Sequence, residues 1–249
     1  MFRIIPSISR LSKCFLIASV LAIPVLTQDD GLADDLNKSF KKFDLVQINN
    51  QQALRSVKEL GSLSLSSENT NLKMILEPND LRSKLFRAED VGAEGVRLLE
   101  RAEVYTYRGR LENDESSKIR LTIDGSRVEG YMISRGDTYF IEPASRYSSK
   151  AQNDSLVIYN KQDYLGEDGF HCPSELDEKI EEGRGFVNKQ SISGISGPGV
   201  IELATEADYE YVNDLGGAAA ANDEIMSILN MVEGTFDTDL DLTIQVTYQ

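Results

Sequence analysis

The pattern of the last fifty residues constrains the fold more than any other feature of the chain. Residues 200–204 form a nearly continuous apolar run, typical of a strand buried on both faces. Residues 218–236 have the periodicity of an amphipathic helix, and residues 240–248 alternate apolar with polar side chains as a second strand does. The apolar stripe of the helix, which we expect to pack in a core, consists of Ile225, Ile228, Leu229, Val232 and Phe236. This order predicts one β-α-β crossover.

A crossover of this size cannot make a stable domain by itself. Two strands and one helix bury too little apolar surface to offset the conformational entropy lost on folding. We therefore expect residues 200–249 to be the opening of a larger α/β domain.

Short alternating segments joined by tight turns occupy residues 104–159. Residues 119–123 alternate in the period of a half-buried strand, and the dipeptide Asp124-Gly125 predicts a tight turn after it. Arg135-Gly136-Asp137 predicts the next turn, although the same letters spell a cell-adhesion tripeptide. Short strands with short connections favour an antiparallel meander over a parallel sheet.

The region before the meander is less regular. Residues 34–43 and 51–60 have apolar residues at helical spacing, and residues 72–76 read as a strand. Residues 62–71 are rich in Ser and Asn and predict a loop. The whole chain therefore predicts an α+β fold, with an antiparallel β-rich part followed by an incomplete β-α-β unit.

The N-terminus has the composition of a secretory signal. A basic leader precedes the apolar run 14–26, which is too short for a comfortable membrane span and suits a signal-peptide core. Cleavage after Ala33 or near Thr27 would fit the small residues there, and an uncleaved N-terminal anchor is the alternative. We expect residues 1–33 to be removed and the remainder to be extracellular, where disulfides are stable.

Charge narrows the range of partners. The formal net charge is −15, which disfavours binding to nucleic acid or to anionic lipid.

Residues 183–199 are rich in Gly and Ser and predict an exposed linker, the preferred kind of site for proteolytic cleavage.

Three segments together resemble the adamalysin (reprolysin) family of zinc metalloproteases. Residues 200–209 resemble the first strand of that family's catalytic domain, and residues 72–86 and 128–143 resemble parts of its prodomain. The resemblance divides the chain into four regions. These are a signal peptide (1–33), a prodomain (34–182), a linker or processing region (183–199) and the N-terminal fragment of a metalloprotease domain (200–249).

The resemblance implies a secreted zinc metalloendopeptidase precursor, in which zinc-activated water hydrolyses peptide bonds of protein or peptide substrates. The family's motif H-E-x-x-H-x-x-G-x-x-H is absent, and His171 is the sole histidine, so this chain as given should be inactive. An activating protease would cut the linker, at Arg184 or Lys189 if it is trypsin-like. We expect no stable membrane anchor once the signal is cleaved. The alternative is a non-enzymatic secreted protein, either a prodomain-like inhibitor or an adhesion module.

Two residues, Cys172 and Glu202, are expected to bind metal ions. Cys172 is the only cysteine after the signal peptide, and the resemblance implies that its thiolate is the inhibitory zinc ligand of a cysteine switch. Pro173-Ser174 replaces the glycine usual after that cysteine, and a free thiol is the alternative. Glu202 matches a position that helps to bind structural calcium in some relatives, although a carboxylate beside a strand is the simpler interpretation.

Overall fold

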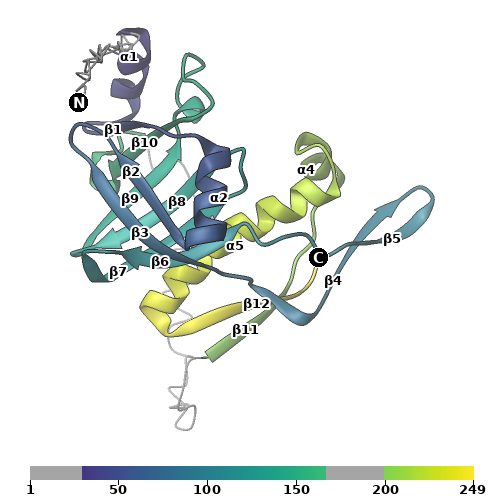
Figure 1. The fold of residues 1–249 in the computed structure, drawn as a ribbon. Coiled ribbons are helices and arrows are strands. Elements are labelled where there is room, and N and C mark those ends of the chain that lie inside the picture. The colour runs from purple at the N-terminus through teal and green to yellow at the C-terminus, as the bar shows by residue number, and fades with distance from the viewer. Residues whose placement is uncertain (1–29, 167–198) are drawn as a thin grey trace, which may run out of the picture.

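The computed structural model describes residues 30–166 and 199–249, which form a mixed α+β fold with mostly antiparallel sheets (Figure 1). One sheet has eight strands in the order β1-β10-β9-β8-β7-β6-β3-β2, and every neighbouring pair is antiparallel. The sheet curls so that its end strands, β1 and β2, approach each other. Its strands are β1 (Asp44–Gln47), β2 (Ser62–Ser66), β3 (Asn71–Pro78), β6 (Thr106–Leu111), β7 (Asp114–Ile123), β8 (Val128–Ser134), β9 (Asp137–Pro143) and β10 (Ser155–Asn160).

The curled sheet encloses an apolar core. Ile119, Leu121 and Ile123 alternate along β7 and are completely buried, which confirms the predicted strand. Helix α2 (Asn50–Leu60) contacts β2 and β7 and adds Ala53 and Val57 to the same core. The meander predicted for residues 104–159 is therefore confirmed.

The turn between β8 and β9 adopts the conformation that its sequence requires. Arg135 and Gly136 have φ values of 54° and 89°, as both central residues of a two-residue type I′ turn must. Ser134 pairs with Asp137 across it. The tripeptide Arg135-Gly136-Asp137 thus forms the predicted hairpin turn.

Helix α1 (Asp30–Ser39) packs on the outer side of β10. Leu32, Leu36 and Phe40 are buried there with Tyr159. The predicted helix at residues 34–43 is therefore present but begins and ends earlier. Residues 1–29, with most of the predicted signal peptide, lie outside the described residues. Of the two predicted cleavage positions, cleavage near Thr27 would leave α1 whole, whereas cleavage after Ala33 would remove its first turn.

The loop predicted for residues 62–71 is wrong. These residues form β2, a short turn and the start of β3. The physical reason is that Leu63 and Leu65 alternate with serines and insert into the core, so burial on one face overrides the turn-forming composition.

A second sheet has four strands in the order β11-β12-β4-β5. Strands β11 (Gly199–Ala204) and β12 (Leu242–Tyr248) are parallel and are connected through α4 (Tyr209–Asp214) and α5 (Ala218–Leu240), which confirms the predicted crossover. Strand β4 (Arg82–Gly92) also runs parallel to β12 and forms a hairpin with β5 (Gly95–Leu99). Figure 1 shows this hairpin projecting from the molecule. Within the described residues, the other edge of β11 has no neighbouring strand.

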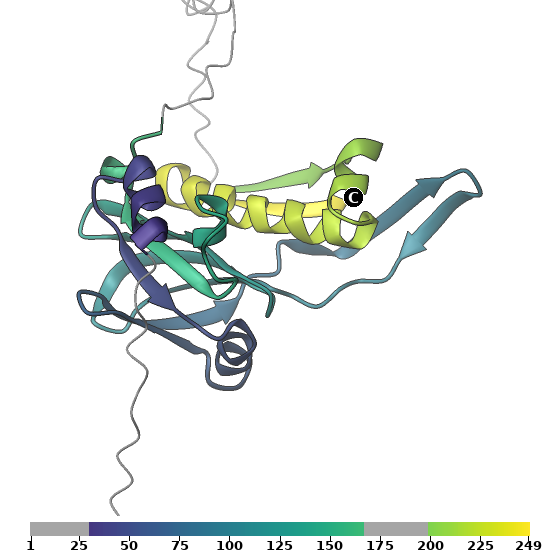
Figure 2. The same cartoon turned by 90° about the horizontal axis from the view of Figure 1, so that it is seen from above.

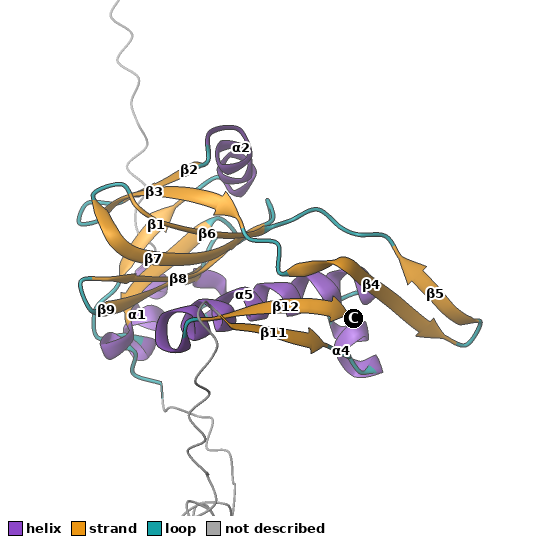
Figure 3. Cartoon of the chain, turned by 90° about the horizontal axis from the view of Figure 1, so that it is seen from below, coloured by secondary structure: helices purple, strands orange, loops and turns teal. Residues whose placement is uncertain are grey.

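Helix α5 lies between the two sheets, as Figures 2 and 3 show from opposite sides. It contacts β7 and β6 of the large sheet and β12 of the small one. No helix among residues 30–166 and 199–249 is long and apolar enough to cross a bilayer.

Candidate functional site at the interface of helix α5 with the large sheet

Helix α5 turns a polar side toward the eight-stranded sheet. Ser227, Asn230 and Glu233 are at most 2% exposed, and Gly234 beside them is also buried. Residues three and four apart lie on one side of a helix, so these four form a single stripe. The residues joined across this interface come from opposite sides of the predicted linker.

Only part of the predicted apolar stripe of α5 therefore packs in a core. Leu229 and Phe236 pack with the small sheet, but Ile228 and Val232 are 42% and 36% exposed. The expectation that the whole stripe packs in a core is wrong. The large sheet presents polar groups to α5. The helix therefore turns its polar stripe, and not its apolar stripe, toward that sheet.

An ion pair lies at the centre of the interface. Arg120 Nε of β7 donates to Glu233 Oε2 at 2.9 Å, and the two side chains are only 6% and 3% exposed. Arg120 also lies 3.4 Å from Asp237 Oδ2, which accepts from Lys118 Nζ at 3.1 Å. Charged side chains that are buried away from water need a partner of opposite charge, and Arg120 and Glu233 are partners of each other.

A second polar contact joins two amides. Asn79 Nδ2 donates to Asn230 Oδ1 at 2.9 Å, and Asn230 Nδ2 donates to the carbonyl oxygen of Leu121 at 3.2 Å. Asn79 follows the end of β3, and its own carbonyl accepts from Thr106 Oγ1 at 2.6 Å. Both asparagines are buried, so each hydrogen bond replaces one that water would otherwise make.

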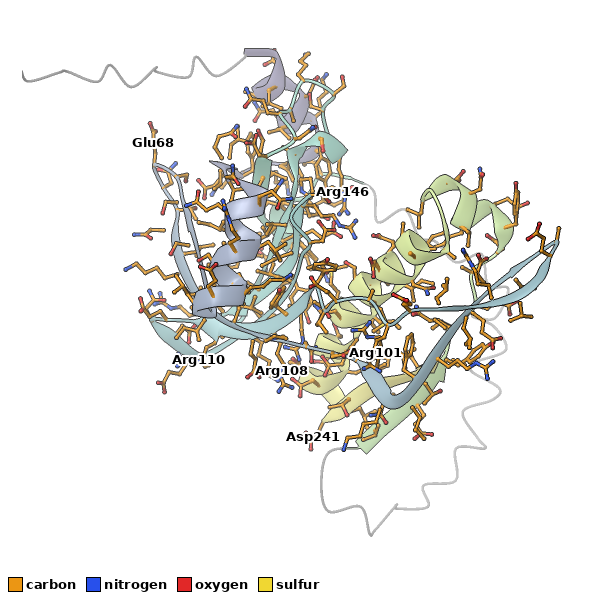
Figure 4. All side chains as sticks on the ribbon, turned by 45° about the vertical axis from the view of Figure 1, so that its right-hand side comes forward. Glu68, Arg101, Arg108, Arg110, Arg146 and Asp241 are labelled. Carbon is orange, nitrogen blue, oxygen red and sulfur yellow. The ribbon has the colours of Figure 1, made fainter. Side chains whose placement is uncertain are left out.

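The third contact joins two hydroxyls to a carboxylate. Thr122 Oγ1 and Ser227 Oγ lie 2.7 Å apart, and Ser227 Oγ donates to Glu129 Oε1 at 3.1 Å. Glu129 is also paired with Arg127 and with Arg146, the residue labelled between the sheet and α5 in Figure 4.

Arg127 extends this network to the N-terminal half of α5, where it pairs with Glu224. Burial acts to lower the pKa of Arg127, but Glu129 and Glu224 together hold that pKa above its usual value. The guanidinium is therefore fixed in its charged form by carboxylates from both sides of the interface.

Gly234 sets the distance between α5 and the sheet. A Cβ at this position would lie 2.2 Å from Tyr131 Oη and 2.6 Å from Arg120 Cγ, closer than real contacts allow. Tyr131 Oη donates to the carbonyl oxygen of Met231 at 3.3 Å, so β8 touches the backbone of the helix. Glycine inside a helix costs about 1 kcal/mol relative to alanine, and the close approach explains its presence.

The apolar part of the contact is small. Leu81 is buried with Met226, Ile244 and Val246, and Phe86 packs at the edge of this cluster. Leu81 and Phe86 are the only members of this cluster that come from residues 30–166.

Arginines flank the apolar cluster. Arg82 and Arg101 lie over the ring of Phe86, at 5.8 and 5.6 Å from its centroid, and Figure 4 shows Arg101 close to the start of the hairpin. Burial acts to raise the pKa of Asp80, but hydrogen bonds from Arg82 and Arg101 lower it overall. Charged groups therefore border the apolar contact.

The residues expected to bind metal are not part of this interface. Cys172 and His171 lie outside the described residues, as does nearly all of the predicted linker. Glu202 is exposed on β11, opposite Gln245 of β12, and its expected role in calcium binding stays a prediction. Within the part of the chain that the structure describes, no three His, Cys, Asp or Glu side chains gather as metal ligands would.

The chain matches no protein-family model, and no curated protein matches it. The charged and polar side chains at the contact of α5 with the large sheet are paired with one another across it.

Proposed function

We propose that this chain is the front part of a secreted zinc metalloendopeptidase precursor of the adamalysin type. In this proposal residues 34–182 are the prodomain and residues 200–249 begin the catalytic domain. The observation that carries the proposal is the way the β11-α5-β12 unit is held. Helix α5 meets the large sheet through polar pairs, while the unit joins the rest of the chain through the pairing of β12 with β4 and the apolar cluster around Leu81.

The exposed surface of this unit also supports the proposal. Among the residues that the structure describes, no strand lies beside the outer edge of β11, and Val200 on that strand is 59% exposed. Ile228 and Val232 add apolar surface on α5. Free edges and apolar surface are what further strands and helices of a larger domain would cover.

The zinc of the full-length enzyme would supply an activated water for peptide hydrolysis. Its three protein ligands would come from sequence beyond Gln249, since His171 is the only histidine here. The thiolate of Cys172 would occupy the open position on the zinc and keep the precursor latent. The large sheet would hold the start of the catalytic domain through α5 until the linker is cut.

The full reading frame tests this function. Expressed with its zinc motif, the precursor is expected to cleave peptides only after the 183–199 region is cut. Cys172→Ser should give measurable activity before any cut, whereas Cys14→Ser in the signal region should not. A full-length protein that stays inactive after cleavage with zinc present would contradict the proposal.

A stand-alone secreted inhibitor is the second candidate. It is favoured by the cluster that Leu81 shares with Met226 and Val246, which ties residues 199–249 to the rest of the chain. This function predicts that the purified chain inhibits a zinc endopeptidase in trans and that Cys172→Ser abolishes the inhibition. Lack of inhibition by the folded wild-type chain would exclude it.

A further inference from the structure

We propose that the open end of the curled eight-stranded sheet binds a neutral sugar. A cavity of about 770 Å³ lies there, between the turns that join β2 to β3, β6 to β7 and β8 to β9 and the outer ends of β1 and β10. This volume is within the range of small-molecule sites, and the mouth of a curled sheet is a common place for such a site. None of the lining residues belongs to α5 or to residues 199–249, so the inference does not depend on the proposed function.

The floor of the cavity is apolar. Four side chains that belong to the enclosed core or pack against it line the cavity, namely Leu72, Leu111, Met132 and Ile158. Tyr139 also lines the cavity and adds an aromatic ring. A sugar ring presents C–H groups on its faces, and these pack favourably on apolar and aromatic side chains. The floor therefore suits one face of a sugar ring.

The rim of the cavity is polar, because the inward-facing rows of the strands change character near the open end. Residues two apart in a strand point to the same side of the sheet. On three strands an apolar core residue has, two positions nearer the opening, a polar residue that lines the cavity. These pairs are Val46 and Asp44 on β1, Met132 and Ser134 on β8, and Ile158 and Asn160 on β10.

Some of the rim groups are paired with one another. Asp114 Oδ2 accepts a hydrogen bond from Ser134 Oγ at 2.6 Å, and its Oδ1 accepts one from Ser116 Oγ at 2.6 Å. Asp44 accepts a hydrogen bond from Thr70. These contacts join β8 to the start of β7 and β1 to the turn before β3, so they hold the rim in place without a ligand.

Other rim groups have capacity left for a ligand. Among the described residues, the side chains of Asp137 and Asp163 make no hydrogen bond or ion pair. The same holds for the side-chain amides of Asn71 and Asn113. Ionised carboxylates only accept hydrogen bonds, whereas an amide both donates and accepts them. The rim therefore offers donors as well as acceptors to a molecule in the cavity.

This combination selects the class of ligand. Four aspartates line the cavity against two cations, Lys42 and Arg135, which disfavours an anion. A wholly apolar molecule would take the polar rim out of water without replacing its hydrogen bonds. A simple organic cation would use the carboxylates but leave the amide donors without an acceptor. A hydroxyl group donates and accepts, so a neutral sugar uses both kinds of rim group and the apolar floor.

Binding of disaccharides to the purified chain tests the proposal. Saturation-transfer NMR is recorded with maltose, lactose, mannobiose and N,N′-diacetylchitobiose, and at least one of them is expected to show saturable binding. Asp137→Ala/Asp163→Ala should weaken that binding about tenfold or more, because two acceptors are lost. Asp34→Ala/Asp214→Ala removes two exposed carboxylates that do not line the cavity, and it should bind the sugar as wild type does.

A variant of the floor completes the test. Leu72→Trp places an indole in the cavity and should abolish sugar binding in a protein that melts as wild type does. The aspartate variant decides the question if Leu72→Trp does not fold. Absence of saturable binding for all four sugars would overturn the proposal, as would wild-type affinity in Asp137→Ala/Asp163→Ala. Binding of 2-phenylethylamine but of none of the sugars would show a cation site instead and would also overturn it.

Discussion

The two sides of strand β7 show how differently one strand can be used. Ile119, Leu121 and Ile123 point into the curled sheet and build a closed apolar core. Arg120 and Thr122 point the other way and meet α5 through an ion pair and a hydroxyl contact. The alternation of one strand thus separates a permanent interior from a polar interface. The first three predictions below change one side of this comparison and the last two concern helix α1, and all are given in decreasing order of expected effect.

The largest effect should come from the core. Leu121→Ala removes a completely buried side chain and leaves a cavity, so the free energy of unfolding should fall by about 4 kcal/mol. Urea unfolding should show the loss in one cooperative transition of the large sheet. An effect below about 1 kcal/mol would mean that the curled sheet is not the main core.

Breaking the ion pair should come next. Glu233→Leu leaves Arg120 buried with only the more distant Asp237, and we expect a loss of about 3 kcal/mol. Arg120→Met/Glu233→Leu should restore most of this loss, because no unpaired charge remains. A double variant as unstable as the single one would show that the interface depends on the charges themselves.

Gly234 tests how closely α5 approaches the sheet. Gly234→Ala should lower the free energy of unfolding by about 2 kcal/mol through overpacking against Tyr131, despite the better helix propensity of alanine. Adding Tyr131→Phe removes the Oη and should recover part of the loss, which thermal melts of all four proteins in the cycle can measure. A stabilising Gly234→Ala would contradict the docking geometry.

The position of the mature N-terminus can be tested on α1. A chain that starts at Asp34 lacks Leu32, which packs with Leu36 and Phe40, and should be less stable by about 2 kcal/mol than one that starts at Gln28. N-terminal sequencing of the protein from its natural source gives the natural start. Equal melting temperatures for the two chains would show that the first turn of α1 contributes nothing.

The smallest effect concerns acid stability at α1. Hydrogen bonds from Lys38, Ser148 and Lys150 hold the pKa of Asp35 well below its usual range. A lowered folded-state pKa means that the stabilisation is complete above about pH 4 and is lost only as the pH falls toward the folded-state value. Asp35→Asn should therefore melt below wild type at pH 7, and the gap should shrink only under acidic conditions. A gap that is the same at pH 7 and pH 2.5 would contradict this assignment.

The sequence predicts the parts of this fold that depend on local periodicity. The alternation at residues 119–123, the turn at Arg135-Gly136 and the β-α-β crossover all follow from spacing and turn chemistry. Strand β4 was missed as a neighbour of β12 because parallel pairing between distant segments leaves no local signal.

The interface at α5 was not predicted either. Helix α5 has an apolar stripe and a polar stripe, and composition favours burial of the first. Which stripe meets the large sheet depends on Arg120 and Glu129, which belong to other strands. A run of weak helix formers at helical spacing could have indicated this interface, because such residues inside a helix usually have a packing reason. The run consists of Ser227, Asn230 and Gly234.

The most direct measurement is the sequence of the transcript beyond the codon for Gln249. Within residues 30–166 and 199–249, β11 has no neighbouring strand on its outer edge, and Val200, Ile228 and Val232 leave apolar surface exposed. If the proposed function is right, the transcript contains an open reading frame with H-E-x-x-H-x-x-G-x-x-H. A stop codon directly after Gln249 in the mature transcript would contradict it.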